Sequence, residues 1–155
     1  MELIEIQKDL FTVEAKYYLA QCISADFGMG KGIAVEFNKY FNMKNRILQE
    51  YGKGYLEETW QENLKAGYKG DCILIDRVFN LITKTHYWEK PTLSSLEAAL
   101  QRMKYYCLRY SIEYVAMPRI GCGLDKLYWP QVKDLLISIF NDTEIEFLVC
   151  TLDNK

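Results

Sequence analysis

The distribution of apolar and polar residues along the chain predicts a series of short strands. Residues 3–7 alternate between apolar and polar positions, which is typical of a half-buried strand. Mainly apolar runs of four to eight residues favour strands that are buried on both faces. Such runs cover residues 17–23, 71–76, 78–83, 114–117 and 145–152.

Apolar residues at helical spacing predict helices between these strands. The first helix is expected near residue 33, from the recurrence of Ile33, Ala34, Phe37, Tyr40 and Phe41. Residues 43–51 predict a second helix. Residues 52–70 are polar and aromatic with four glycines, and they predict an irregular excursion containing a short helix.

Two further helices are predicted in the second half of the chain. The earlier one can be capped by Thr92 or Ser94, with Glu97 placed to complete a capping box on Ser94. Its expected core face is Leu93, Leu96, Leu100, Met103 and Cys107. The later one begins near Trp129 with Pro130 in its first turn, and its expected core face is Val132, Leu135, Leu136, Ile139 and Phe140.

This order of elements predicts an α/β fold, with helices on both faces of a largely parallel or mixed sheet. The adjacent runs 71–76 and 78–83 can pair as a hairpin, because Asp76-Arg77 suits a tight connection. With 155 residues and no repeat or linker, we expect a single domain spanning residues 1–155.

Composition narrows the classes of function. The formal charge of −2 provides no broad basic field for nucleic acid, although a local patch stays compatible with it. The start of the chain lacks the pattern of a secretory leader, and no apolar run approaches the roughly 20 residues of a membrane helix. We therefore expect a cytoplasmic protein with no membrane partner. No feature speaks to the oligomeric state, for which we expect a monomer.

Cysteine and histidine usage argues against a metal site. The five cysteines form no CxxC pair, and four lie in apolar stretches, where a free cysteine is usually a small buried residue. Only Cys122 lies in a glycine loop. The single histidine, His86, excludes an HExxH site and is expected in packing or at the surface. We predict no metal and no cofactor.

Two glycine-rich loops provide the main functional signal. Residues 24–32 and 118–125 each follow a predicted strand and precede a predicted helix. Glycines let several backbone N–H groups converge on an anion, and loops at the carboxyl ends of strands are the usual ligand sites of α/β sheets. Either loop alone is more often a simple turn, and neither matches a Walker A or GxGxxG sequence. Together they favour a diphosphate ligand.

Three charged residues are candidates for chemistry. Lys84 ends a predicted strand, and it is either a solvated edge charge or an amine nucleophile. Asp125 precedes a helix, so it is either a cap or a proton-transfer group. Asp9 either ends a strand or accepts a hydrogen bond from a purine amino group.

Four motifs resemble those of a macrodomain, in particular the branch of terminal ADP-ribose protein glycohydrolases. They are Gln21-Cys22-Ile23-Ser24, Met29-Gly30-Lys31-Gly32-Ile33-Ala34, Leu81-Ile82-Thr83-Lys84 and Met117 through Asp125. The resemblance runs nearly end to end, and it implies a three-layer α/β/α sandwich with a mixed central sheet that binds ADP-ribose.

The resemblance also implies roles for individual residues. Asp9 would bind the adenine amino group, with Leu10, Thr151 and Leu152 near the base. The segments 30–34 and 120–124 would wrap the diphosphate and the distal ribose, with Ser24 close to that ribose; they include Gly30, Gly32, Ile33, Ala34, Ile120, Gly121, Cys122, Gly123 and Leu124. Met29, Pro118 and Arg119 would also belong to the ADP-ribose site. Lys84 would attack the anomeric carbon of the distal ribose, and Asp125 would help to resolve the lysyl adduct without a metal.

The implied activity is removal of mono-ADP-ribose from acidic side chains and from O-acyl-ADP-ribose. The expected partners are ADP-ribose and ADP-ribosylated protein, and ADP-ribosylated DNA is a less supported substrate because no dense Lys/Arg stripe is present. Two alternatives stay open, namely a reader that binds ADP-ribose without turnover and a phosphatase for ADP-ribose 1″-phosphate. The aromatic segment 85–88 leaves the leaving-group preference open.

Overall fold

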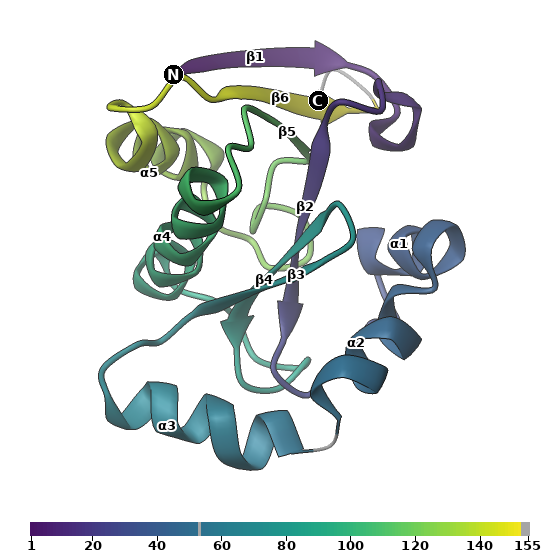
Figure 1. Cartoon of the computed structure of the whole chain (residues 1–155), viewed down its shortest axis with the longest axis vertical. Coiled ribbons are helices and arrows are strands. Elements are labelled where there is room, and N and C mark those ends of the chain that lie inside the picture. Colours follow the sequence, from purple (N-terminus) through teal and green to yellow (C-terminus); the bar gives the residue numbers. More distant parts are fainter. Residues whose placement is uncertain (53, 153–155) are drawn as a thin grey trace.

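A computed structural model describes residues 1–52 and 54–152 of the protein, and these residues contain a six-stranded mixed sheet (Figure 1). The strands lie in the order β1–β6–β5–β2–β4–β3, and only the β3–β4 pair is antiparallel. Their bounds are β1 Glu2–Gln7, β2 Tyr18–Ser24, β3 Asp71–Ile75, β4 Val78–Lys84, β5 Tyr114–Met117 and β6 Glu146–Thr151. The predicted α/β class and the hairpin of β3 and β4 are confirmed.

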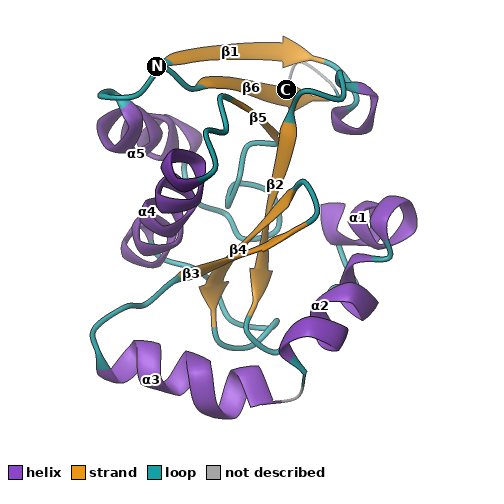
Figure 2. Ribbon diagram, in the orientation of Figure 1, coloured by secondary structure: helices purple, strands orange, loops and turns teal. Residues whose placement is uncertain are grey.

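Helices cover both faces of this sheet (Figure 2). Helices α1 and α2 lie on one face, and α4 and α5 lie on the other. The helical segments are η1 (a 3₁₀ turn) Leu10–Thr12, α1 Ile33–Phe41, α2 Met43–Tyr51, η2 (a π-helical turn) Tyr55–Thr59, α3 Trp60–Lys65, α4 Leu93–Arg109 and α5 Trp129–Phe140. The three-layer arrangement is therefore confirmed.

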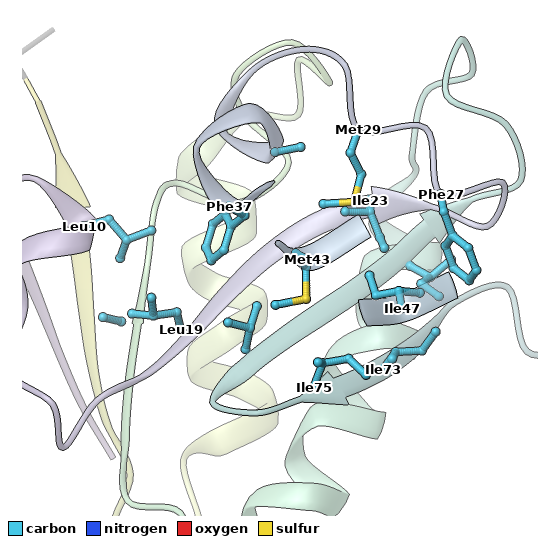
Figure 3. Packing of buried hydrophobic residues seen from close by; sticks show 14 of the residues in the cluster. Leu10, Leu19, Ile23, Phe27, Met29, Phe37, Met43, Ile47, Ile73 and Ile75 are labelled. Atoms are coloured by element: carbon cyan, nitrogen blue, oxygen red, sulfur yellow. The ribbon is translucent and has the colours of Figure 1, made fainter. Parts of the chain in front are cut away.

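The alternation of side chains along β4 explains why both faces are covered. Val78 and Ile82 pack in the cluster that holds α1 and α2, whereas Phe79 and Leu81 pack in the cluster beneath α4 and α5. A strand that is apolar on both faces needs cover on both faces, because buried apolar area is the main driving force of folding. Figure 3 shows Phe37, Met43 and Ile47 packed over the first of these faces.

The excursion predicted for residues 52–70 contributes to the core. The η2 turn runs directly into α3, and the side chains of Tyr55 and Trp60 are almost completely buried. The Trp60 indole N–H donates to the Thr85 hydroxyl at 2.9 Å, so α3 is fastened to the end of β4.

The structure confirms Thr92, one of the two predicted N-caps of α4, whereas the predicted capping box on Ser94 is wrong. Thr92 is the N-cap, and its partner in the capping box is Ser95, not Glu97 on Ser94. Thr92 has the extended backbone of an N-cap, so the box forms two residues before the expected position. Leu93 and Leu135, which were expected in the core, are partly exposed, while the other predicted core residues of α4 and α5 are buried.

Free cysteines are mostly buried, as predicted. Cys72, Cys107 and Cys150 lie in the core, and Cys22 is partly exposed. Within the described residues, no helix has the length and apolar character needed to cross a membrane.

Candidate active site

The carboxyl ends of β2, β4 and β5 bring three separate polar segments to one edge of the sheet. Ser24, the last residue of β2, lies opposite Lys84, the last residue of β4, after a register shift at Ile23/Ser24. Pairing continues beyond both strands, because the Ala25 N–H donates to the Lys84 carbonyl at 2.9 Å. The loop after β5 emerges at the same edge, since β5 is parallel to β2. The segments predicted to meet on one rim do so.

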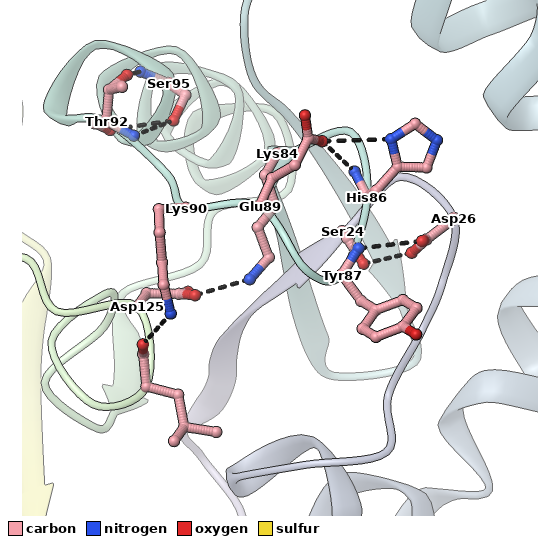
Figure 4. Close-up of polar contacts among 11 residues, drawn as sticks. Ser24, Asp26, Lys84, His86, Tyr87, Glu89, Lys90, Thr92, Ser95 and Asp125 are labelled. Carbon is pink, nitrogen blue, oxygen red and sulfur yellow. Dashed lines mark hydrogen bonds and ion pairs between the residues drawn. The ribbon is translucent and has the colours of Figure 1, made fainter.

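Lys84 and Asp125 form an ion pair at this rim, although 41 positions separate them in sequence (Figure 4). The Lys84 Nζ lies 2.7 Å from the Asp125 Oδ1, and the two side chains are only 13% and 15% exposed. An amine beside a carboxylate has a proton acceptor within hydrogen-bond reach, which is the arrangement required to generate a neutral amine nucleophile. The pair can therefore support nucleophilic chemistry.

Asp125 reaches Lys84 because the loop that carries it is tightly folded. Gly121 has φ +74°, a left-handed backbone that favours glycine, and a Cβ there would lie 2.9 Å from the Leu127 side chain. The Leu127 N–H donates to the Gly121 carbonyl at 2.7 Å, which closes the turn. Gly123, by contrast, faces open space, so its missing side chain leaves the backbone accessible.

The two glycine loops touch each other. Gly32 is the N-cap of α1 with φ +63°, and a Cβ on it would lie 3.3 Å from the Leu124 side chain of the other loop. Gly30 faces open space, and Ile33 and Ala34 form the first turn of α1. Free N–H groups at a helix start, with an exposed glycine backbone on either side, suit an anion such as a diphosphate.

Comparison with known proteins places this architecture in a family, although no family model matches the sequence. The chain is 35% identical over 151 residues to the human protein named ADP-ribose glycohydrolase OARD1, covering 95% of this chain and 90% of that protein. The chain belongs to that macrodomain family.

Solved macrodomains share the fold at low identity. The macrodomain of Thermus aquaticus DarG is 22% identical, with a TM-score of 0.75 over 96% of this chain and 97% of that one. A structure of Thermosipho africanus DarTG in complex with ADP-ribose is 21% identical, with a TM-score of 0.70 over 99% of this chain and 43% of that one. At these identities the likeness supports the fold alone.

Two residues that sequence reasoning left out organise the Lys84 end of the rim in this macrodomain. Asp26 accepts hydrogen bonds from the Ser24 hydroxyl and from the backbone N–H groups of Gly28 and Tyr87. Partial burial acts to raise the pKa of Asp26, but these donors outweigh it and hold the pKa below its ordinary value. Lys90 donates to the Leu124 carbonyl at 2.7 Å and so ties the loop after β4 to the second glycine loop.

Asp26 and Lys90 differ in how far their contacts could have been predicted from the sequence. An Asp two residues before a Gly often binds the backbone of its own turn, so Asp26-Phe27-Gly28 could have been identified. Nothing local distinguishes Lys90 from a solvated lysine, because its acceptor lies 34 positions away.

The end of the rim predicted to hold adenine is built from β1 and β6. The Lys8 N–H donates to the Thr151 carbonyl at 2.8 Å, which places the residues that follow both strands side by side. Asp9 uses one carboxylate oxygen to accept the Phe11 N–H at 3.0 Å, and its other oxygen accepts no hydrogen bond from residues 1–52 or 54–152. Leu152 is 76% exposed beside them. Asp9, Thr151 and Leu152 therefore share one end of the rim.

Several predicted ligand residues have buried side chains. Leu10, Met29, Ala34 and Ile120 belong to the hydrophobic clusters, so only their backbone atoms and the edges of their side chains can face a ligand. The Arg119 guanidinium points toward β1 and α5, with Nη2 3.6 Å from Glu5 and the group lying over the Trp129 ring. Pro118 is partly exposed beside it.

The surroundings of Cys122 and His86 argue against a catalytic role for either side chain. Burial raises the pKa of the Cys122 thiol to about 11, and the thiol donates to the Ile120 carbonyl, so it is a poor nucleophile at neutral pH. The His86 ring stacks on Trp88 with 4.4 Å between ring centroids and lies 3.4 Å from the Glu89 carboxylate. Among the described residues, no group of three or more His, Cys, Asp or Glu side chains is placed to hold a metal ion.

Proposed function

We propose that the protein is an ADP-ribose glycohydrolase that removes mono-ADP-ribose from acidic side chains and from O-acyl-ADP-ribose. The observation that carries this proposal is the shielded Lys84–Asp125 pair, 2.7 Å apart, next to two touching glycine loops. A module that only bound ADP-ribose would need the loops but would have no use for an amine and a carboxylate in contact at the rim.

In the proposed reaction, ADP-ribose lies along the rim with its diphosphate over the start of α1 and the exposed backbone of Gly30 and Gly123. Asp9 accepts a hydrogen bond from the adenine amino group at one end, and the distal ribose reaches Lys84 at the other. This assignment agrees with the chemistry of the groups present, namely free N–H donors for the anion and a carboxylate for the amino group.

The chemical step transfers the ribose to Lys84 and then to water. Asp125 accepts a proton from the Lys84 ammonium, and the neutral amine forms a bond to the anomeric carbon while the bond from that carbon to the carboxylate oxygen breaks. The released carboxylate leaves with both electrons of that bond. Water then attacks the anomeric carbon of the lysyl adduct while the bond from that carbon to the Lys84 nitrogen breaks, and Asp125 returns its proton to the departing amine. This step gives free ADP-ribose, releases one proton to solvent and restores the ion pair.

The test is release of ADP-ribose from a glutamate-automodified transferase by the wild type, Lys84→Ala and Asp125→Ala. Calorimetric binding of ADP-ribose to the same proteins separates catalysis from affinity. Loss of turnover in both variants with binding retained supports the proposal, and a mass increase on Lys84 in Asp125→Ala strengthens it. Lys126→Ala, an exposed neighbour, is the matched control for removing a lysine at this rim.

Failure would take one of two forms. If Lys84→Ala turned over normally, the lysine mechanism would be wrong. If the wild type bound ADP-ribose and released nothing, the protein would be a reader or would act on another linkage, and ADP-ribose 1″-phosphate and DNA-linked ADP-ribose would be the next substrates. The proposal includes a monomeric, cytoplasmic enzyme, and light scattering in solution tests the monomer.

A further inference from the structure

A cleft of about 270 Å³ lies beside Lys84 but apart from the two glycine loops. Its walls come from α3, from the end of β4 and from the start of α4, and no residue of 24–34 or 118–125 lines it. The Lys84 stem forms part of the wall while its ammonium reaches Asp125. An occupant of this cleft would therefore lie next to the reacting centre without competing with ADP-ribose for the loops.

The cleft has an excess of positive charge. Lys69 lines it, and the Lys69 ammonium has no ion-pair partner within residues 1–52 and 54–152. Lys90 also lines it, and its ammonium donates to the Leu124 carbonyl, a neutral acceptor that leaves its charge uncompensated. Glu89 also lines the cleft and carries the opposite charge, and its carboxylate accepts the His86 backbone N–H at 2.6 Å. The lining lysines Lys69, Lys84 and Lys90 outnumber it. A small anion would supply the missing negative charge.

The position of Lys69 is fixed by its neighbour. Gly70 packs so closely on the first turn of α4 that a Cβ there would lie 2.1 Å from the Ser95 carbonyl oxygen. The backbone that carries Lys69 is therefore held against the same helix start that closes the cleft, so the exposed Lys69 side chain begins at the edge of the cleft.

A buried hydroxyl without a hydrogen-bond partner also lies in the wall of the cleft, within the described residues. Thr83 lines the cleft, is 2% exposed, and its Oγ1 has no hydrogen-bond partner within the described residues. An unsatisfied buried hydroxyl is unfavourable and marks a place where a polar group is missing. Trp60 and Leu64 of α3 form an apolar wall of the same cleft. The combination suits a ligand with an apolar stem and an oxygen-rich end.

We propose that this cleft binds a second carboxylate of the modified protein, supplied by an acidic residue adjacent to the ADP-ribosylated one. The methylene groups of that side chain pack on Trp60 and Leu64, and its carboxylate meets Lys69 and Lys90, with the Thr83 hydroxyl in the wall beside it. The inference rests on the proposed hydrolysis of ADP-ribosyl esters, and it adds a preference for clustered acidic sites. The cleft is small and carries two lysines besides Lys84, which suits one side chain better than a nucleic-acid strand.

The test compares two peptides that each carry one ADP-ribosyl-glutamate. In one the adjacent residue is glutamate and in the other it is glutamine. The wild type is expected to show a kcat/KM about fivefold higher for the glutamate peptide, as for a partly exposed charge pair, with most of the difference in KM. Lys69→Ala and the near-isosteric Thr83→Val are expected to reduce that ratio toward one. Lys65→Ala, which removes an α3 lysine outside the cleft, is expected to keep it.

A charge reversal makes the test sharper. Lys69→Glu is expected to favour a peptide with an adjacent lysine over the glutamate peptide. Thermal unfolding of each variant shows whether a lost preference comes from lost structure, and because Lys69 is exposed, its variants are expected to fold normally.

O-acetyl-ADP-ribose, which has no adjacent residue, separates the two proposals. If the wild type hydrolyses it but treats both peptides equally, the cleft proposal is overturned while the glycohydrolase proposal stands. If the wild type hydrolyses neither peptide nor O-acetyl-ADP-ribose, the proposed function itself fails. If instead an ADP-ribosylated single-stranded oligonucleotide depends on Lys69 and the peptides do not, the cleft serves a phosphate and the acidic-residue assignment is wrong.

Discussion

The two ends of the rim are built in different ways. At the end proposed to hold the distal ribose, side chains from distant segments contact one another, as in the Lys84–Asp125 pair and the Lys90–Leu124 contact. At the end proposed to hold adenine, the backbone ladder of β1 and β6 fixes the position, and among the described residues the Asp9 side chain hydrogen-bonds only to its own turn. Substitutions at the first end should therefore change chemistry and loop geometry, whereas substitutions at the second should change affinity for one part of the ligand.

The largest expected effect is at Asp125. Asp125→Asn keeps the size of the side chain but removes the proton acceptor for Lys84, so kcat for ADP-ribosyl-glutamate should fall by about 10²- to 10⁴-fold. Calorimetry should show an ADP-ribose affinity close to that of the wild type. If kcat fell by less than about threefold, Asp125 would not be the proton acceptor for Lys84, and the two ends of the rim would not differ in their role in catalysis.

Gly121 and Gly123 form a matched pair within one loop. Gly121→Ala places a side chain on a left-handed backbone against Leu127, so the free energy of unfolding should fall by about 1–2 kcal/mol. Gly123→Ala points into open space and should leave stability nearly unchanged. Denaturant unfolding of both variants checks this. Equal losses would mean that the loop is not held by its own turn.

Asp9 tests the adenine end. Asp9→Ala removes an acceptor for the adenine amino group, so the affinity for ADP-ribose should fall about tenfold, the equivalent of one hydrogen bond to a charged group. The analogue with hypoxanthine in place of adenine lacks that amino group, and its affinity should change far less. At saturating substrate kcat should be retained. A fall in kcat would show that the two ends are coupled.

The smallest expected effect is the pH dependence of stability that comes from Asp26. The folded pKa of Asp26 is lowered, so its carboxylate contributes stability above the unfolded pKa of about 3.9, and this contribution is lost as pH falls through the folded pKa. Asp26→Asn should therefore unfold at a lower temperature than the wild type near pH 7, with the gap closing in acid. Calorimetric melts across this range measure it. A gap that did not narrow as the pH falls below the unfolded pKa of about 3.9 would assign the effect to packing.

Periodicity predicted most of the fold because strands and helices here carry strong local patterns. The hairpin at Asp76-Arg77 and the short helix within 52–70 were both predictable from local composition. The capping box was assigned wrongly because Thr92 and Ser94 both suit a cap, and only backbone geometry chooses between them.

The site was predictable where it depends on loop sequence and less so where it depends on contacts. Lys84 and Asp125 were named as candidates, but their proximity depends on a loop turn at Gly121 that no pattern fixes. The buried state of Ile120 and Met29 follows from packing between layers, which a residue list does not show. The cleft beside Lys84 depends on α3, whose docking on β4 is equally invisible in sequence.

The parallel pairing of β1 with β6 has a practical consequence for handling the protein. Parallel neighbours start at one edge of the sheet and end at the other, so Met1, whose ammonium donates to the Thr143 carbonyl, lies a full strand length, about 20 Å, from Thr151. A fluorophore, affinity tag or surface linker attached ahead of Met1 would sit far from the ligand. The same attachment just after β6 would lie beside the end of the rim proposed to hold adenine, where it could block entry or, with a suitable dye, report occupancy directly.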